Sequence, residues 1–202
     1  MICTDGSPNN SAFQVLFFHG AGAGCDSAFM QTVAMHWAQL GAFVVRPDFP
    51  YWERIRETGK RCPPNSQAQL QQFTREVIQQ YPCDNLILAG KSMGSRVATA
   101  MADELRAKAV VAMGFPFQPP GKAGKDRSAE LQLSHCPGWI AQGRRDPFAR
   151  NVNTEKLPAN WQLQWYEAGD HSLQPSKRSG ISDDQYWRRV AEHSYQFMRE
   201  QC

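Results

Sequence analysis

The chain has 202 residues, of which 42% are hydrophobic and 20% are charged, and its formal net charge is +3. This length suits one domain, and the composition is typical of a globular protein. The small net charge gives no argument for nucleic-acid binding, and no apolar run is long enough to cross a membrane. We therefore expect a single domain over residues 1–202, with residues 1–12 loosely held, no nucleic-acid partner and no membrane insertion.

The N-terminal segment and the cysteines bear on location. Residues 1–11 are polar and lack the apolar core of a secretory signal, so the sequence predicts a cytoplasmic protein. The six cysteines include no C-x-x-C pair, which favours reduced thiols over a disulfide framework or a metal site. Neither a metal ion nor a cofactor is predicted.

Short apolar runs alternate with amphipathic stretches along the chain. The apolar runs predict strands at residues 14–19, 42–46, 85–89, 109–113, 139–142 and 162–167. Apolar residues at helical spacing predict helices near residues 26–40, 66–81, 92–108 and 182–198. This order predicts an α/β fold, in which a mainly parallel sheet of about six strands carries helices on both faces. Functional residues then gather at the carboxyl ends of the strands.

The sequence Gly90-Lys91-Ser92-Met93-Gly94 follows the strand at residues 85–89 and matches G-x-S-x-G. A nucleophilic serine on a tight strand-to-helix turn needs small neighbours, because the strand and the helix come close together there. The helix N-terminus also places partial positive charge beside a developing oxyanion. The alternative is a glycine-rich turn whose serine only caps the helix. The position of the motif favours Ser92 as a nucleophile.

A second glycine-rich loop, residues 19–24 (HGAGAG), follows the first predicted strand. The backbone amide of Ala21, or of Gly22 as the alternative, could form an oxyanion hole together with the amide of Met93. A phosphate-binding loop is the rival interpretation, but the G-x-x-x-x-G-K-[ST] order is absent. We interpret His19 as structural, because it ends the strand in front of the glycines.

Asp146 and His171 follow the last two predicted strands. The order Ser92, Asp146, His171 is the chain order of the catalytic residues in α/β-hydrolases. Asp146 could orient the His171 imidazole, although an aspartate before a proline is also common in simple turns. Asp170 is adjacent to His171 in the chain and is poorly placed to accept its ring N–H. The sequence therefore predicts Ser92, Asp146 and His171 as the catalytic residues.

Aromatic and basic residues cluster in the loops at the same edge of the predicted sheet. Five aromatic residues are predicted to line an apolar substrate pocket: Tyr51, Trp52, Phe115, Phe117 and Phe148. Five basic residues could steer an anionic ester or thioester: Arg46, Arg54, Arg56, Lys60 and Arg61. The alternative for this basic segment is a solvated surface, since Glu53 and Glu57 are interleaved with it.

On these motifs the chain resembles the α/β-hydrolases. More narrowly, it resembles the small family of testis-expressed hydrolase-like proteins, which includes a subunit of a non-specific-lethal histone acetyltransferase complex and uncharacterised bacterial members. The likeness rests on residues 19–24 (HGAGAG), 46–64 (RPDFPYWERIRETGKRCPP), 90–96 (GKSMGSR), 114–122 (GFPFQPPGK), 143–148 (GRRDPF) and 169–172 (GDHS). It implies the same three catalytic residues. Compared with larger hydrolases, the sequence lacks the first two strands of the sheet and any stretch long enough for a helical lid, so we expect a compact fold with an open pocket.

The predicted function is a serine hydrolase of the EC 3.1 class. It would cleave small or medium carboxylic esters or thioesters through an acyl-enzyme intermediate. A hydrolase-like binding or scaffold module is the alternative from another class. Lactone or amide cleavage also stays open, because one set of catalytic residues serves many substrates. The sequence does not indicate the oligomeric state.

Overall fold

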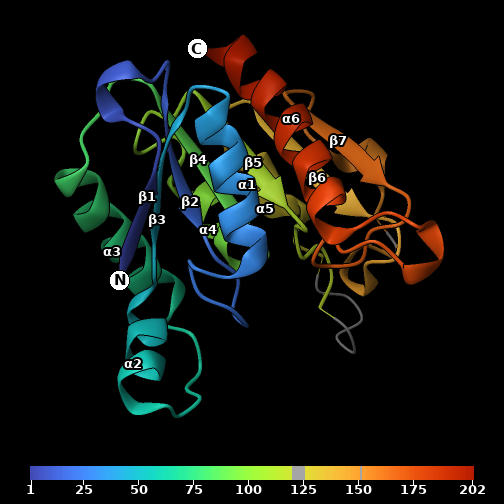
Figure 1. Ribbon diagram of the computed structural model, residues 1–202. Coiled ribbons are helices and arrows are strands. Elements are labelled where there is room, and N and C mark those ends of the chain that lie inside the picture. Colours follow the sequence, from blue (N-terminus) through green and yellow to red (C-terminus); the bar gives the residue numbers. More distant parts are fainter. Residues whose placement is uncertain (120–125, 151) are drawn as a thin grey trace.

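A computed structural model describes residues 1–119, 126–150 and 152–202. Its centre is a seven-stranded sheet with the strand order β1-β3-β2-β4-β5-β6-β7 (Figure 1). Only β1 runs antiparallel to its neighbour, and the other pairs are parallel. The strands are β1 (Ile2–Asp5), β2 (Gln14–Phe18), β3 (Phe43–Pro47), β4 (Leu86–Lys91), β5 (Ala109–Met113), β6 (Gly138–Gly143) and β7 (Trp161–Tyr166). The predicted α/β fold with a mainly parallel sheet is confirmed.

Helices cover both faces of the sheet. On one face α1 packs against α6, and on the other α4 packs against α3 and α5. Figure 1 shows α1 and α6 in front of the sheet, and α2 projecting beyond the edge where β3 ends. The helices are α1 (Ala28–Gln39), α2 (Pro50–Thr58), α3 (Gln67–Gln80), α4 (Met93–Met101), α5 (Ser128–Gln132) and α6 (Asp183–Gln201).

The central strands are apolar on both sides because both faces are covered. In β4, Ile87 and Ala89 belong to the core beneath α1 and α6, whereas Leu86 and Leu88 belong to the core beneath α3 and α4. This is the burial pattern that parallel sheets require. By the same alternation, Lys91 at the end of β4 lies on the side of α1 and α6.

Strand β1 lies within residues 1–12, a segment for which the sequence predicted no strand. Residues 2–5 pair with β3, and the Arg46 guanidinium donates to the Asp5 carboxylate at 2.8 Å. The described sheet therefore has seven strands, one more than the six apolar runs, and the additional strand pairs antiparallel with β3. The four residues ICTD show no clear strand pattern, so this strand depends on pairing with a distant segment.

No lid domain interrupts the described part of the fold. Between β6 and β7 the described residues form only two short 3₁₀ helices, at Pro147–Ala149 and Thr154–Lys156. Residues 120–122 of the family-like stretch 114–122 lie outside the described residues. None of the described helices has the length and apolar character needed to span a membrane.

The first turn of α4 lies directly against β2 and β4. A Cβ atom added at Gly94 would overlap the carbonyl oxygen of Phe18, and one added at Gly90 would overlap the backbone of Gly94. Only glycine lets the helix and the two strands come this close. The position of the helix relative to the sheet therefore depends on these two residues.

Replacing Gly94 by alanine should destabilise the fold. The new methyl group would have to displace backbone atoms of β2, and such overpacking typically costs about 1–3 kcal/mol or more. Gly22→Ala is the matched control, because its Cβ would meet no atom within 4 Å. Urea unfolding measures both variants. Equal stability of Gly94→Ala and the wild-type protein would contradict the packing described here.

Candidate active site

Ser92 occupies the sharp turn between β4 and α4. Its backbone has φ 52° and ψ −112°, a conformation that residues other than glycine rarely adopt. The Ser92 amide donates to the Met113 carbonyl of β5 at 2.9 Å, and the Ser92 carbonyl accepts from the Ser95 hydroxyl at 2.6 Å. These hydrogen bonds and the glycine contacts of α4 hold the strained turn. The Ser92 side chain consequently stands at the carboxyl edge of the sheet.

His171 lies in the tight loop that follows β7. The Asp170 carboxylate accepts hydrogen bonds from the amides of Ser172 and Gln174, at 2.8 Å and 3.0 Å. Leu173 is fully buried with φ 53°, and its carbonyl accepts from the Trp187 indole of α6. Asp170 thus shapes the loop that carries His171.

Asp146 follows β6 and is almost completely buried. Its carboxylate accepts from the Phe148 amide at 2.8 Å and from the Gln142 side-chain amide. The same carboxylate lies 2.8 Å from His171 Nδ1, and His171 Nε2 lies 2.8 Å from the Ser92 hydroxyl. The structure therefore joins Ser92, His171 and Asp146 in one chain of hydrogen bonds. Gln142 is a partner that the sequence motifs did not indicate.

Of the five aromatic residues predicted to line a pocket, only Phe148 contacts His171. Its ring stacks on the imidazole at a centroid distance of 4.3 Å. For Tyr51, Phe115 and Phe117 the prediction is wrong, because these side chains are buried in the core beneath α3 and α4. Trp52 packs against the other side of the glycine loop, beside Gly24. The burial of Tyr51, Phe115 and Phe117 depends on tertiary packing, which the sequence does not reveal.

The glycine loop is held from beneath by buried polar groups. His19 is fully buried: its Nε2 accepts from the Phe49 amide at 3.0 Å, and its Nδ1 lies 2.7 Å from the Gly20 carbonyl. Burial lowers the pKa of His19 below its ordinary value. The Tyr51 hydroxyl donates to the same Gly20 carbonyl at 3.0 Å. These contacts agree with a structural role for His19.

Asp48 fixes the far end of the glycine loop. It is fully buried, and its carboxylate accepts from the Cys25 amide at 2.8 Å and from the Arg56 guanidinium. Burial alone would raise the pKa of Asp48, but these hydrogen bonds lower it below its ordinary value. Arg56 also contacts Asp26.

Two of the five basic residues in this segment are paired with carboxylates. Arg46 and Arg56 are engaged in ion pairs, with Asp5 and with Asp26 and Asp48 respectively. Arg54, Lys60 and Arg61 are exposed. Two of the five positive charges are therefore paired within the fold, which neither substrate steering nor a solvated surface predicted for Arg46 and Arg56.

A cavity of about 490 Å³ opens beside the Ser92 hydroxyl. Its walls come from the glycine loop, from the N-terminal part of α1, from the loop after β7 and from α6. The described residues that line it are Gly20, Ala21, Gly22, Ala23, Ser27, Phe29, Met30, Lys91, Ser92, Phe148, His171, Ser172, Gln174 and Trp187. The cavity thus joins the predicted serine and histidine to both candidate loop amides.

The backbone amides of Ala21, Gly22 and Met93 are available for a ligand. None of the three donates a hydrogen bond to another described residue. The Met93 amide is also the first of α4, where the helix dipole adds partial positive charge. These donors suit an oxygen atom that becomes negatively charged.

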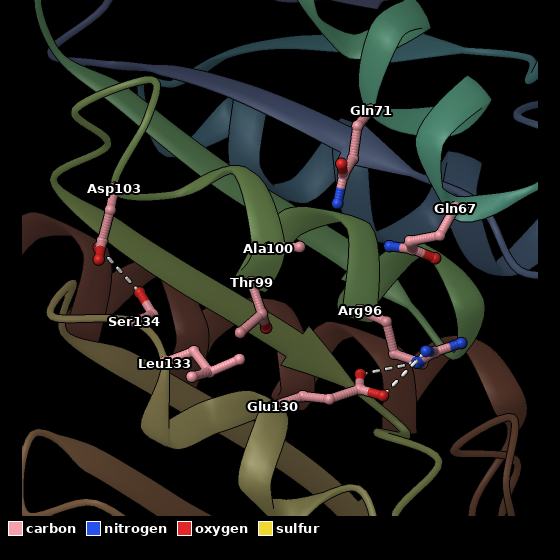
Figure 2. A pocket seen from close by; sticks show the side chains of 9 residues that line it. All are labelled: Gln67, Gln71, Arg96, Thr99, Ala100, Asp103, Glu130, Leu133 and Ser134. Carbon is pink, nitrogen blue, oxygen red and sulfur yellow. Dashed lines mark hydrogen bonds and ion pairs between the residues drawn. The ribbon is translucent and has the colours of Figure 1, made fainter.

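A second cavity, of about 360 Å³, lies between α3, α4 and α5, away from Ser92. Figure 2 shows the Arg96 guanidinium directed at the Glu130 carboxylate and the Ser134 hydroxyl directed at the Asp103 carboxylate. The Arg96–Glu130 contact is 2.8 Å long. None of the residues predicted for the active site lines this cavity.

Comparisons with known proteins bear on the family and on the fold of the chain. A model of the alpha/beta hydrolase domain matches residues 11–199. Among solved structures, the chain is similar to Est1E from Butyrivibrio proteoclasticus with ferulic acid bound, with a TM-score of 0.70 and 16% identity, covering 100% of this chain and 94% of that one. The dienelactone hydrolase from Anabaena variabilis gives a TM-score of 0.73 and 19% identity, covering 96% and 88%.

A thioesterase domain from the curacin biosynthetic pathway is also similar, with a TM-score of 0.67 and 15% identity, covering 98% of this chain and 94% of that chain. At these identities the likeness to solved structures shows the fold alone.

Replacing Asp48 by alanine should lower the free energy of unfolding by about 2 kcal/mol, because the buried Cys25 amide loses its acceptor and Arg56 loses one of its two carboxylates. Asp84→Ala, which removes an exposed carboxylate before β4, is the matched control and should change the free energy by less than about 0.5 kcal/mol. Because the pKa of Asp48 is lowered on folding, its contribution is complete above the unfolded value of about 4 and is lost as the pH falls below it.

Urea unfolding between pH 7 and pH 3 measures this contribution. The difference between the Asp48→Ala variant and the wild-type protein should shrink as the pH falls. A difference that is constant with pH would contradict the role given to the Asp48 charge.

Proposed function

Because the chain belongs to the alpha/beta hydrolase domain family, we propose that it is a serine hydrolase of carboxylic esters or thioesters. Ser92 is the nucleophile, His171 is the general base, and Asp146 orients the imidazole. The observation that carries this proposal is the chain of two 2.8 Å contacts from the Ser92 hydroxyl through His171 to Asp146. Ser92 and His171 line a cavity that is large enough for a small or medium substrate.

The geometry supports an acyl-enzyme mechanism. His171 Nε2 takes the Ser92 proton as the hydroxyl oxygen attacks the carbonyl carbon, and Asp146 stabilises the resulting imidazolium. His171 then gives this proton to the leaving alcohol or thiol. Water attacks the acyl-Ser92 intermediate with the same base, which releases the acid and restores the serine. The stacked Phe148 ring and the buried Asp146 keep the imidazole in this orientation throughout.

The oxyanion of both tetrahedral intermediates is held by backbone amides. The Met93 amide supplies one hydrogen bond, and the amide of Ala21 supplies the second, with Gly22 as the alternative. Two observations support these donors. Ala21 and Gly22 line the cavity and Met93 directly follows Ser92, and none of the three amides has an acceptor among the described residues. Losing one such donor typically reduces the rate by about 10²–10³-fold.

Within the family, we assign the chain to the small group of testis-expressed hydrolase-like proteins. The stretches 90–96 and 46–64 support this assignment. The site is open, since no lid domain is present among the described residues, and this favours short acyl chains over long-chain lipids. Similar folds in a dienelactone hydrolase and a thioesterase make lactones and thioesters reasonable substrates to include in a test panel.

The first functional prediction concerns the three proposed catalytic residues. Turnover of short p-nitrophenyl esters should fall by at least about 10³-fold in Ser92→Ala and His171→Gln, and by about 10²–10⁴-fold in Asp146→Asn. His135→Gln is the matched control, because His135 is 97% exposed and distant from the cavity. Steady-state kinetics on folded protein measures all four variants.

Full activity in Ser92→Ala would contradict the proposal. The absence of turnover for esters, thioesters, lactones and amides in the folded wild-type protein would also contradict it. That second result would favour a binding or scaffold module.

Proline substitutions can decide which amide of the glycine loop contributes to the oxyanion hole. Ala21→Pro removes the N–H group of Ala21, so it should reduce kcat by about 10²–10³-fold with a smaller effect on KM. Gly22→Pro is the matched comparison and should retain most of the activity. The reverse order would assign the donor to Gly22, and full activity in both variants would exclude this loop as a donor.

A further inference from the structure

Lys91 lies in the candidate active site, although no sequence motif assigned it a role. It is the last residue of β4 and directly precedes Ser92. Its side chain lines the same cavity, on the side of α1 and α6. The ammonium group donates to the Ser172 hydroxyl at 3.3 Å and lies 5.8 Å from the centre of the Phe29 ring. The Lys91 charge therefore faces the space beside the nucleophile.

This charge has no carboxylate partner among the described residues. Within residues 1–119, 126–150 and 152–202, no salt bridge includes Lys91 and no acidic side chain lines the cavity. Asp170 and Asp146 are the nearest negative charges, but each is already committed to other hydrogen bonds. Burial lowers the pKa of Lys91, and these two carboxylates oppose that shift. In the second cavity, by contrast, the positive charge of Arg96 is paired with the Glu130 carboxylate (Figure 2).

An ammonium group that is partly withdrawn from water without a counter-charge is unfavourable unless an anion approaches it. The cavity offers an environment for such an anion. The Ser172 oxygen accepts from Lys91, so the hydroxyl proton of Ser172 is free to donate to the same ligand. The side chains of Phe29, Met30 and Trp187 supply an apolar wall for methylene groups.

From this placement we infer that the preferred substrate is an ester or thioester of a short acid that carries a second, free carboxylate. Lys91 is the specificity-determining residue that pairs with this carboxylate. One ammonium group balances the single charge of a carboxylate, whereas a phosphate would keep an uncompensated charge in a cavity lined by no second lysine or arginine among the described residues. The inference rests on the proposed hydrolase function and specifies its substrate class.

Two esters of equal acyl length test this inference: monoethyl glutarate, which carries the free carboxylate, and ethyl pentanoate, which does not. For each protein the ratio of kcat/KM for the two esters is measured by chromatography of the released acid. We expect a wild-type ratio of about 10 or more, as one charge-assisted contact supplies. Lys91→Met should reduce the ratio about 10-fold or more, mainly through KM for the anionic ester, and Lys91→Arg should retain most of the preference.

Lys108→Met is the matched control. Lys108 is exposed and directly precedes β5, so it lies at the amino ends of the strands, whereas the cavity lies at their carboxyl ends. This variant therefore removes the same charge far from the cavity. It should keep the wild-type ratio. A wild-type ratio of one or less, an unchanged ratio in Lys91→Met, or an equal decrease in Lys108→Met would each overturn the inference while leaving ester hydrolysis itself intact.

Binding to a protein without the nucleophile separates this inference from the proposed function. Ligand-observed NMR with the Ser92→Ala variant should show binding of monoethyl glutarate that the Ser92→Ala/Lys91→Met variant loses. This result would support the anion site even if neither ester is hydrolysed. Equal binding of monoethyl glutarate and ethyl pentanoate to Ser92→Ala would overturn the inference.

Discussion

The close contact between the first turn of α4 and the ends of β2 and β4 is the constraint on which the site depends. Gly90 and Gly94 have no space for a Cβ atom, so the helix begins almost in contact with the sheet. The chain can turn this sharply only if Ser92 adopts a positive φ, and this conformation brings its side chain out at the carboxyl edge. The same turn places the Met93 amide at the helix N-terminus. One packing contact therefore positions both the proposed nucleophile and one proposed oxyanion donor.

The other parts of the site are held by polar contacts that reach it from separate strands. Asp146 comes from the end of β6 and is fixed by Gln142 and by its own turn. His171 comes from the loop after β7, whose shape depends on Asp170. The glycine loop follows β2 and rests on His19 and Asp48. Because parallel strands end at one edge, these segments meet although they are distant in the sequence.

The sequence predicted those features that local patterns encode. Six apolar runs predicted six strands, and the glycine spacing around Ser92 predicted the strand-to-helix turn. Strand β1 was missed because ICTD is short and depends on pairing with β3 and on the ion pair between Arg46 and Asp5. Tyr51, Phe115 and Phe117 were assigned to the pocket because a position after a strand does not reveal depth in the core. Lys91 and Gln142 gave no signal, since no motif indicates that their side chains contact Ser172 and Asp146 in the folded chain.

The central claim is that Ser92 is an activated nucleophile, and covalent labelling tests it most directly. The wild-type protein and the Ser92→Ala variant are treated with a fluorophosphonate probe, and the adduct is located by peptide mass spectrometry. The account predicts a single adduct on Ser92 in the wild-type protein and none in the variant. A folded wild-type protein that stays unlabelled, or that is labelled equally after Ser92→Ala, would contradict the account.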